Sequence, residues 1–335
     1  MPHRNPQFAH YIMKSTLKFC LGALASCALT FASVSAHAGP YTQMVVFGDS
    51  LSDNGNVFAA TGGGLPVFPY LPGRFSDGQV WVEGLATALG LPALTPSLLG
   101  GTNYAWGGAR SGSAPGSVPG VLTQLAIWGG NPANAFADPN ALYVVVAGGN
   151  DMRDARGASS TAVSRQAAAD AAAGNIAAAV STLASRGARH VLISNLPDLG
   201  NTFEAVLLGL VANSSDVSQR FSTAISGLEA MLEALFPNLD IDMLDMAGIT
   251  AAVRTDALTN GGATYGITNA TRPCGTFAGS AGAACNVSLF SDALHPSAAG
   301  HALLAQAALQ LVPEPATPLL VALALMGLVV LRRRA

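Results

Sequence analysis

The sequence predicts an α/β protein of three layers, in which helices cover both faces of a central parallel sheet. Three observations predict this class: short apolar runs recur along the chain, each of them ends at a turn, and helix-forming segments lie between them. Strands that are apolar along their whole length are typical of parallel sheets, because both faces of such sheets are buried. Alternation of strands with helices favours parallel, right-handed connections.

The predicted strands are four runs rich in Val, Ile and Leu, of which the last is the weakest. They cover residues 41–47, 141–147, 189–194 and 239–244. The first run stops at Gly48-Asp49-Ser50, and the second stops at Gly148-Gly149, directly before Asn150. Ligand sites of such sheets lie beyond the carboxyl ends of the strands. Ser50 and Asn150 are therefore expected at the site.

Three segments have the composition or spacing of helices, namely the Ala-rich segment 164–186, the segment 215–236 before Pro237, and the final segment 303–311. Two other segments, 59–80 and 111–140, are rich in Gly, Pro and Ala and lack a clear period. We predict that both are long surface loops. Loops of this length in a compact domain often form lids or substrate walls.

Composition and charge exclude one class of partner. The chain has 335 residues, of which 50% are hydrophobic and 10% charged, so it can bury a substantial core in one large domain or two small ones. The formal net charge of −3 argues against nucleic acid, since phosphate binding needs a basic surplus. No lysine lies between residues 39 and 312, so this body is acidic once the two ends are set aside.

The N-terminal residues 1–38 are predicted to be a secretory signal peptide. Lys14 and Lys18 precede an apolar run, and the small-residue pattern Ala36-His37-Ala38 follows it. This layout predicts cleavage after Ala38. A short N-terminal anchor helix is the alternative, and translation starts at Met1 or at Met13.

The C-terminal residues 313–335 combine Pro313-Glu314-Pro315, an apolar run over 316–331 and three arginines at 332–334. The run is slightly short for a transmembrane helix, which needs about 17 residues or more. The arginines favour a cytoplasmic end and disfavour a buried core helix. The three-part order resembles the PEP-CTERM sorting signal of Gram-negative bacteria. The resemblance implies export, transient membrane anchoring and removal of the tail by an exosortase-type processing enzyme. One folded domain over 39–312 would remain.

Two cysteines remain outside the predicted signal peptide. Cys274 and Cys285 flank a Gly/Ala-rich stretch. One cysteine pair in an exported protein predicts a disulfide, which would contribute roughly 3 kcal/mol by the chain-entropy model. A metal site is the competing interpretation, although two lone cysteines lack the usual four-ligand pattern.

Candidate chemistry begins with Ser50, which follows the first predicted strand at a Gly-Asp turn. A serine hydroxyl becomes a nucleophile when a base removes its proton; otherwise Ser50 is a turn serine that bonds its own backbone. The histidines of the body are His190, His295 and His301. His190 begins a predicted strand, and His301 lies on the last helix, where we expect a surface or supporting position. His295 is therefore the candidate base.

Asp292 lies three residues before His295, and this spacing lets a turn bring the two side chains together. A carboxylate in that position accepts the ring N–H and stabilises the imidazolium. Three other carboxylates, Asp49, Asp53 and Asp151, suggest a metal or acid/base cluster, but we predict neither a metal nor a cofactor. Asp53 and Asn54 are expected to brace the loop after Ser50.

Four segments carry a family resemblance, and they occur in this order: 47–53 (FGDSLSD), 101–109 (GTNYAWGGA), 148–151 (GGND) and 292–296 (DALHP). Together they resemble the GDSL-type SGNH hydrolases over nearly the whole body. The resemblance implies a five-stranded parallel sheet in the flavodoxin-like order. It also implies a Ser50, Asp292 and His295 triad, with Asp49 and Asp151 supporting the loops.

The resemblance also implies three donors for the oxyanion of acyl transfer: the Ser50 N–H, the Gly108 N–H and the Asn150 side chain. Gly108 is chosen over Gly107 because it lies five residues after Asn103, as in the family, and Gly107 stays open. Asn150 as a turn residue is the alternative interpretation.

These residues predict a secreted enzyme that hydrolyses carboxylic acyl esters through an acyl-serine intermediate. The expected substrate is a lipid, or an acylated small molecule or polysaccharide. The pattern from Phe47 to Asn56 looks most like the bacterial lipase and phospholipase branch. Alternatives are a polysaccharide acetylesterase on the same fold, a catalytically silent surface or matrix-binding protein, and an acyltransferase that uses the same acyl-serine.

Overall fold

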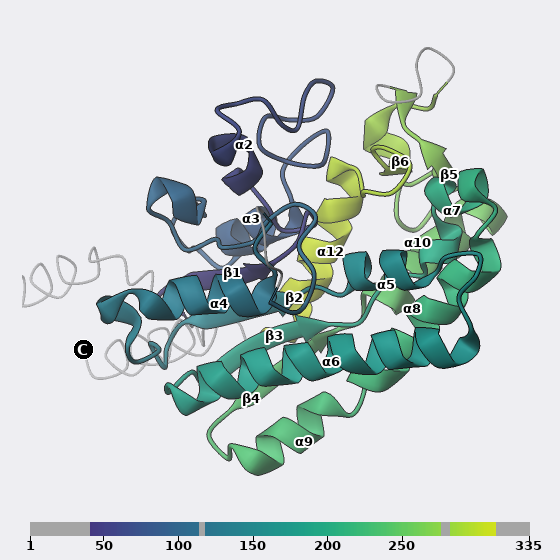
Figure 1. Ribbon diagram of the computed structural model, residues 1–335. Helices are drawn as coiled ribbons and strands as arrows, with labels where there is room; N and C mark the ends of the chain where they lie inside the picture. The colour runs from purple at the N-terminus through teal and green to yellow at the C-terminus, as the bar shows by residue number, and fades with distance from the viewer. Residues whose placement is uncertain (1–40, 114–117, 276–281, 313–335) are drawn as a thin grey trace, which may run out of the picture. The chain divides into compact units, whose positions relative to one another are not determined.

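The computed structural model describes residues 41–113, 118–275 and 282–312 (Figure 1). The predicted signal peptide, 1–38, and the predicted sorting segment, 313–335, lie outside the described residues. All of the predicted strands and site residues fall within them.

The central sheet has four parallel strands. They are β1 (Met44–Gly48), β2 (Leu142–Val146), β3 (His190–Ser194) and β4 (Asp240–Leu244), in the spatial order β1-β2-β3-β4. Each strand coincides with a predicted run to within a few residues. Because the strands are parallel, their carboxyl ends share one edge, where Ser50 and Asn150 follow β1 and β2.

The predicted fifth strand is reduced to one bridge. The Val46 N–H donates to the Thr102 carbonyl (3.0 Å), and the Tyr104 N–H donates to the Val46 carbonyl (2.7 Å). Asn103 thus pairs with β1 in parallel at the strand edge that β2 leaves open. Its side chain accepts the Ala105 N–H and turns the chain away before a strand can lengthen. The expectation of five strands is corrected to four strands and this bridge, while the predicted fold class is confirmed.

Helices cover both faces of the sheet, as the strand alternation requires. Val45, Phe47, Val145 and Ile193 face one layer, which contains α4 (Val121–Gly130), α6 (Ala162–Ser185), α8 (Val211–Ile225) and α9 (Leu228–Leu235). Met44, Val46, Val144 and Leu192 face the other layer, which contains α3 (Trp81–Ala88) and α12 (Ala298–Leu311). Figure 1 shows α6 and α4 on one side of the sheet, with α12 and α3 behind it.

The remaining elements connect these layers. The helices are α2 (Asn56–Ala60), α5 (Gly149–Ala155), α7 (Phe203–Leu208) and α10 (Met246–Thr259). The 3₁₀ turns are Ser97–Leu99, Pro132–Asn134, Leu199–Asn201 and Cys285–Val287. A separate parallel pair consists of β5 (Asn269–Pro273) and β6 (Ser288–Phe290).

Three helix and loop predictions need correction. The segment 111–140 is not all loop, because Val121, Leu125 and Trp128 form a buried stripe at helical spacing within α4. The single helix predicted over 215–236 is two helices, α8 and α9, with a break at Ser226-Gly227. The last helix begins five residues earlier than predicted, since Ser297 caps α12 by accepting the Gly300 N–H.

The predicted disulfide is present between Cys274 and Cys285. Cys274 directly follows β5, and the Cys285–Val287 turn leads into β6. The bond therefore fastens the start of the segment that runs on through Ser291 to Asp292.

Among the described residues, α6 is long and apolar enough to cross a membrane by length and composition. Its buried face, which includes Ile176, Val180 and Leu183, packs into the core that also holds strand residues. We therefore interpret α6 as a core helix.

Candidate active site

The loop after β1 presents Ser50 at the carboxyl edge of the sheet. The N–H groups of Ser52 and Asp53 both donate to the Asp49 carbonyl at 3.0 Å, which closes a tight turn around Ser50. Gly48 makes the turn possible, because a Cβ at this position would lie 2.6 Å from the Val146 carbonyl oxygen.

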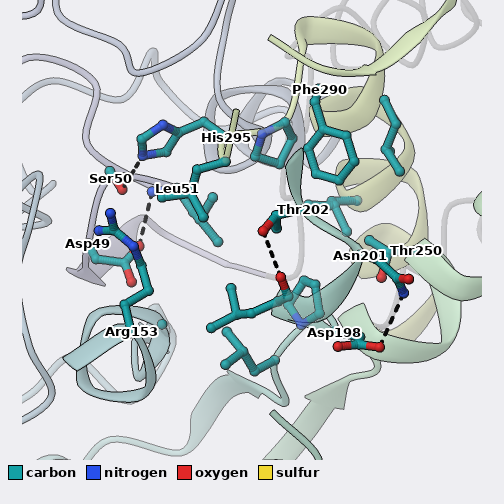
Figure 2. A pocket seen from close by; sticks show the side chains of 18 of the residues that line it. Asp49, Ser50, Leu51, Arg153, Asp198, Asn201, Thr202, Thr250, Phe290 and His295 are labelled. Atoms are coloured by element: carbon teal, nitrogen blue, oxygen red, sulfur yellow. Dashed lines mark hydrogen bonds between the residues drawn. The ribbon is translucent and has the colours of Figure 1, made fainter. Parts of the chain in front are cut away.

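Ser50, His295 and Asp292 form one continuous line of hydrogen bonds. Ser50 Oγ lies 2.9 Å from His295 Nε2, and His295 Nδ1 lies 2.7 Å from Asp292 Oδ2. Figure 2 shows the ring of His295 turned toward the Ser50 hydroxyl. The side chains of His295 and Asp292 are only 14% and 18% exposed. The structure thus brings together all three residues that the sequence singled out for proton transfer.

Four donors surround the Asp292 carboxylate. Oδ1 accepts the backbone N–H groups of Leu294 (2.7 Å) and His295 (2.5 Å). Oδ2 accepts the Tyr70 hydroxyl (2.6 Å) in addition to the His295 ring. Burial alone raises the pKa of Asp292, but the hydrogen bonds from His295 and Tyr70 outweigh it and hold the pKa below its ordinary value. The carboxylate is therefore ionised at neutral pH.

Tyr70 and Phe75 reach the site from the loop 59–80, and sequence reasoning missed both. The Phe75 ring lies 5.5 Å from the His295 ring, and the Tyr70 ring lies 6.2 Å from Phe75. The two aromatic rings therefore form a wall against the imidazole. The only signal in the sequence was the length of the loop, which predicted a substrate wall without naming a residue.

Each candidate oxyanion donor has an N–H group that is free to donate a hydrogen bond. In the described ranges neither the Ser50 N–H nor the Gly108 N–H has a hydrogen-bond acceptor, and Asn150 Nδ2 uses one of its two protons on the Ala109 carbonyl (2.9 Å). The Gly107 N–H donates instead to Asp53 Oδ2 (2.8 Å), so this alternative donor is occupied. Gly108 has a φ of +82°, which disfavours any residue with a side chain.

Arg153 is a third residue that the sequence did not reveal. Its Nη1 donates to Asn150 Oδ1 at 3.1 Å, and its Nη2 donates to Glu204 Oε1 at 2.6 Å. The buried Arg156 also donates to the Glu204 carboxylate. Burial raises the pKa of Glu204, but these two guanidinium groups lower it below its ordinary value. The Glu204 N–H in turn donates to the Ala293 carbonyl (2.8 Å), next to Asp292.

The remaining carboxylates brace loops, as the sequence predicted. Asp53 accepts four backbone N–H groups, from Gly55, Asn56, Val57 and Gly107. Asn54 Oδ1 accepts the side-chain amide of Asn103. Asp151 accepts the N–H and the hydroxyl of Ser111, and Asp49 accepts the Leu51 N–H. Burial raises the pKa of Asp49 to about 6.

No metal cluster is evident in the part of the chain that the structure describes, which holds no group of three or more His, Cys, Asp or Glu side chains suited to an ion. The other two histidines lie away from the reacting hydroxyl. His190 packs edge-on against Tyr41 at 5.3 Å, at the start of β3. His301 is 1% exposed, so of the two positions expected for it, surface or supporting, the surface one is wrong. Because α12 begins early, His301 packs beneath α3, where its Nδ1 accepts the Trp81 N–H, and burial lowers its pKa to about 3.

A largely apolar pocket opens beside the Ser50 hydroxyl (Figure 2). One wall follows β3 and includes Leu196, Pro197 and Leu199. The facing wall comes from β6 and the loop after it, with Leu289, Phe290 and Leu294. Such a lining suits a hydrocarbon chain better than a polar group.

A hydroxyl, an imidazole and a carboxylate in one hydrogen-bonded line at the edge of a parallel sheet are the arrangement of a serine hydrolase. The chain belongs to the GDSL-like lipase/acylhydrolase family, whose model matches residues 44–308. The model of the PEP-CTERM protein-sorting motif matches residues 311–334, which indicates export through a sorting system of Gram-negative bacteria.

Curated relatives include longer proteins. An uncharacterized protein in the trpE-trpG intergenic region of Pseudomonas putida is 30% identical over 326 residues, which cover 89% of this chain and 52% of the relative. Lipase 1 of Photorhabdus luminescens is 33% identical over 211 residues, which cover 62% and 30% of the two chains. The chain thus spans about half the length of these relatives, or less. Among solved structures, Est24, a carbohydrate acetylesterase from Sinorhizobium meliloti, is 17% identical with a TM-score of 0.45, covering 80% of this chain and 97% of that chain.

Proposed function

We propose that this protein is an exported carboxylic ester hydrolase that works through an acyl-serine intermediate. The observation that carries the proposal is the continuous line from Ser50 through His295 to Asp292, with bonds of 2.9 and 2.7 Å. A base must lie within hydrogen-bond reach of the proton that it removes, and His295 Nε2 meets this requirement before any substrate is bound.

The proposed reaction has two halves. Ser50 Oγ attacks the ester carbonyl carbon while His295 Nε2 takes the hydroxyl proton, and His295 then returns this proton to the leaving alcohol. Water attacks the acyl-serine in the same way and releases the acid. Asp292 stabilises the imidazolium in both halves, and its four donors keep it ionised.

The developing oxyanion is proposed to bind the N–H groups of Ser50 and Gly108 and the Asn150 amide. Their free protons support this role, and the bond from Gly107 to Asp53 disfavours Gly107. Arg153 is proposed to position Asn150, since its guanidinium holds the amide oxygen and thereby directs Nδ2. A fixed donor costs no reorganisation when the charge forms, which is why such positioning accelerates acyl transfer.

The proposed substrate is an ester with an apolar acyl or alcohol chain. Leucines on two walls of the pocket beside Ser50 support this class, because they can bury hydrocarbon. Polar side chains, among them Asp198, Thr250 and Arg254, line the same pocket. We further propose the division of the chain expected from the sequence, with a signal peptide over 1–38, the hydrolase domain over 39–312 and a sorting segment over 313–335. Transient anchoring and exosortase processing of the last segment belong to the same proposal, which the family match over 311–334 supports.

Hydrolysis of 4-nitrophenyl esters of graded chain length tests the proposal. We expect the exported protein to cleave them and Ser50→Ala to lose at least about 1,000-fold in kcat, because the nucleophile is gone. The exposed Ser159→Ala is the matched control and should keep full activity. A fluorophosphonate should label the parent and the control but not Ser50→Ala. A folded parent that neither turns over any of these esters nor takes the label would refute the assignment.

A further inference from the structure

Exposed apolar side chains of the described residues gather in two segments. The first is the loop after α2, where Leu65, Val67, Phe68 and Leu71 are 51%, 58%, 87% and 36% exposed. The second is α7 and the residues just after it, where Val206, Leu207, Leu208 and Val211 are 44–65% exposed. Elsewhere in the described ranges, large apolar side chains are exposed singly or in pairs. In Figure 1 the first segment follows the helix labelled α2, and the second includes the helix labelled α7. We call these eight side chains the apolar rim.

Both halves of the rim are fastened to the same short loop of the active site. Tyr70 belongs to the first segment, and its hydroxyl donates to Asp292 at 2.6 Å. Glu204 lies in the first turn of α7, and its backbone N–H donates to the Ala293 carbonyl at 2.8 Å. Tyr70 and Glu204, 134 positions apart in the chain, therefore contact neighbouring residues beside His295. Each of the two segments is thus linked by one hydrogen bond to the loop that carries His295.

The rim also lacks charge. No Asp, Glu, Lys or Arg occurs from Thr61 to Gly73, nor from Ala205 to Ser215. The charged residues that border these stretches are paired: Arg74 with Glu83, and Glu204 with Arg153. Large apolar patches on a soluble protein mark interaction sites, and the absence of charge excludes a partner recognised through salt bridges.

We propose that the apolar rim is a contact surface for a lipid–water interface, on which the ester substrate is presented to Ser50. The proposal rests on the proposed ester hydrolysis and adds the physical form of the substrate. A hydrocarbon layer needs no complementary shape and no polar partner, so isolated leucine, valine and phenylalanine side chains suffice to bind it. The apolar pocket beside Ser50 then receives a chain drawn from that layer.

Binding is tested first without turnover, by flotation of Ser50→Ala protein with phosphatidylcholine vesicles. In this background, Phe68→Ser combined with Leu207→Ser should weaken vesicle binding at least about tenfold, because each substitution removes a large side chain from the layer. Phe136→Ser is the matched control. Phe136 is 83% exposed but precedes β2, at the opposite end of the sheet from the site. This control should bind as Ser50→Ala alone does.

Turnover is then compared on one ester in two physical forms, tributyrin below and above its solubility limit. The parent should accelerate when droplets appear. Phe68→Ser with Leu207→Ser should hydrolyse dissolved tributyrin at the parent rate, since neither side chain touches the reacting groups, and should lose most of the acceleration. Phe136→Ser should keep both rates.

Vesicle binding that is unchanged in the double variant would overturn the proposal, as would an equal loss in the Phe136→Ser control. Parent protein that dimerises in sedimentation, with the dimer abolished by the double variant, would assign the rim to a second copy of the chain and also overturn it. The two proposals fail separately. A parent that binds vesicles through the rim but cleaves no ester would support lipid contact by the rim and refute ester hydrolysis. A parent that cleaves dissolved ester but does not accelerate on droplets would support ester hydrolysis and refute lipid contact by the rim.

Discussion

Two loops touch the catalytic line, and they are built on opposite principles. The nucleophile loop, residues 48–57, buries a polar network in which Asp49, Ser52, Asp53, Asn54 and Asn56 are at most 4% exposed. The rim loop, residues 61–73, exposes apolar side chains and reaches the site through Tyr70. Buried, satisfied polar groups hold one geometry, whereas exposed apolar groups cost stability and serve contact with something else. One loop therefore places the Ser50 hydroxyl, and the other carries the surface for which we propose lipid contact.

The largest effect is expected when the nucleophile loop loses its central acceptor. Asp53→Ala removes the acceptor of four backbone N–H groups. Within the loop, the shortest of these hydrogen bonds come from Gly55 and Asn56. We expect the free energy of unfolding to fall by about 3 kcal/mol or more, because buried donors without acceptors are costly, and activity to fall with it. Urea denaturation measures the change. Asp170→Ala, at an exposed position of α6, is the control; equal stability of the two variants would contradict this account.

A smaller effect is expected in the pH dependence of stability, to which Asp49 of the nucleophile loop contributes. Burial raises the pKa of Asp49 to about 6, above its value in the unfolded chain. The folded state therefore binds more protons between pH 4 and 6, and stability should fall as pH rises through this window, by at most about 1.4 kcal/mol per pH unit. Asp49→Asn should remove this part of the slope. Unfolding free energies measured from pH 4 to 7 test it, and identical slopes in parent and variant would argue against a raised pKa.

The smallest effect is expected in the rim loop. Tyr70→Phe removes one of four donors to Asp292 and leaves the other three. We expect kcat to fall about threefold to tenfold with KM nearly unchanged, which corresponds to the loss of about 1 kcal/mol from one hydrogen bond. Steady-state kinetics on a dissolved ester measures this split. Tyr265→Phe, at a residue 37% exposed, is the matched control. A rise in KM alone would make Tyr70 a substrate contact and not a positioning residue.

The sequence predicted the position of the nucleophile loop because its tight turn is closed by residues that are neighbours along the chain. The turn at Gly48-Asp49-Ser50 and the Asp292 to His295 spacing are local patterns, and the strands that carry them are apolar throughout. Tyr70 could not be found this way, since its contact with Asp292 crosses 222 positions and its loop has no period. Arg153 was hidden for a related reason, because its role depends on Glu204, which lies 51 positions away.

Errors in the predicted elements have similarly local causes. α4 was overlooked within a Gly- and Pro-rich stretch, although Val121, Leu125 and Trp128 have helical spacing. The fifth strand was expected from family resemblance, and the Asn103 side chain ends it after one bridge. Neither error moved a candidate residue of the site, because the strands that carry Ser50 and Asn150 were placed correctly.

Glu204 contacts two parts of the proposed site. Its carboxylate holds the guanidinium that grips Asn150, and its N–H holds the chain beside Asp292. The first turn of α7 is thus committed to the reaction, while the next turn, Val206 to Leu208, faces solvent. On the proposal that the apolar rim contacts lipid, substitutions confined to these three positions should change the preference for lipid surfaces and leave proton transfer nearly unchanged.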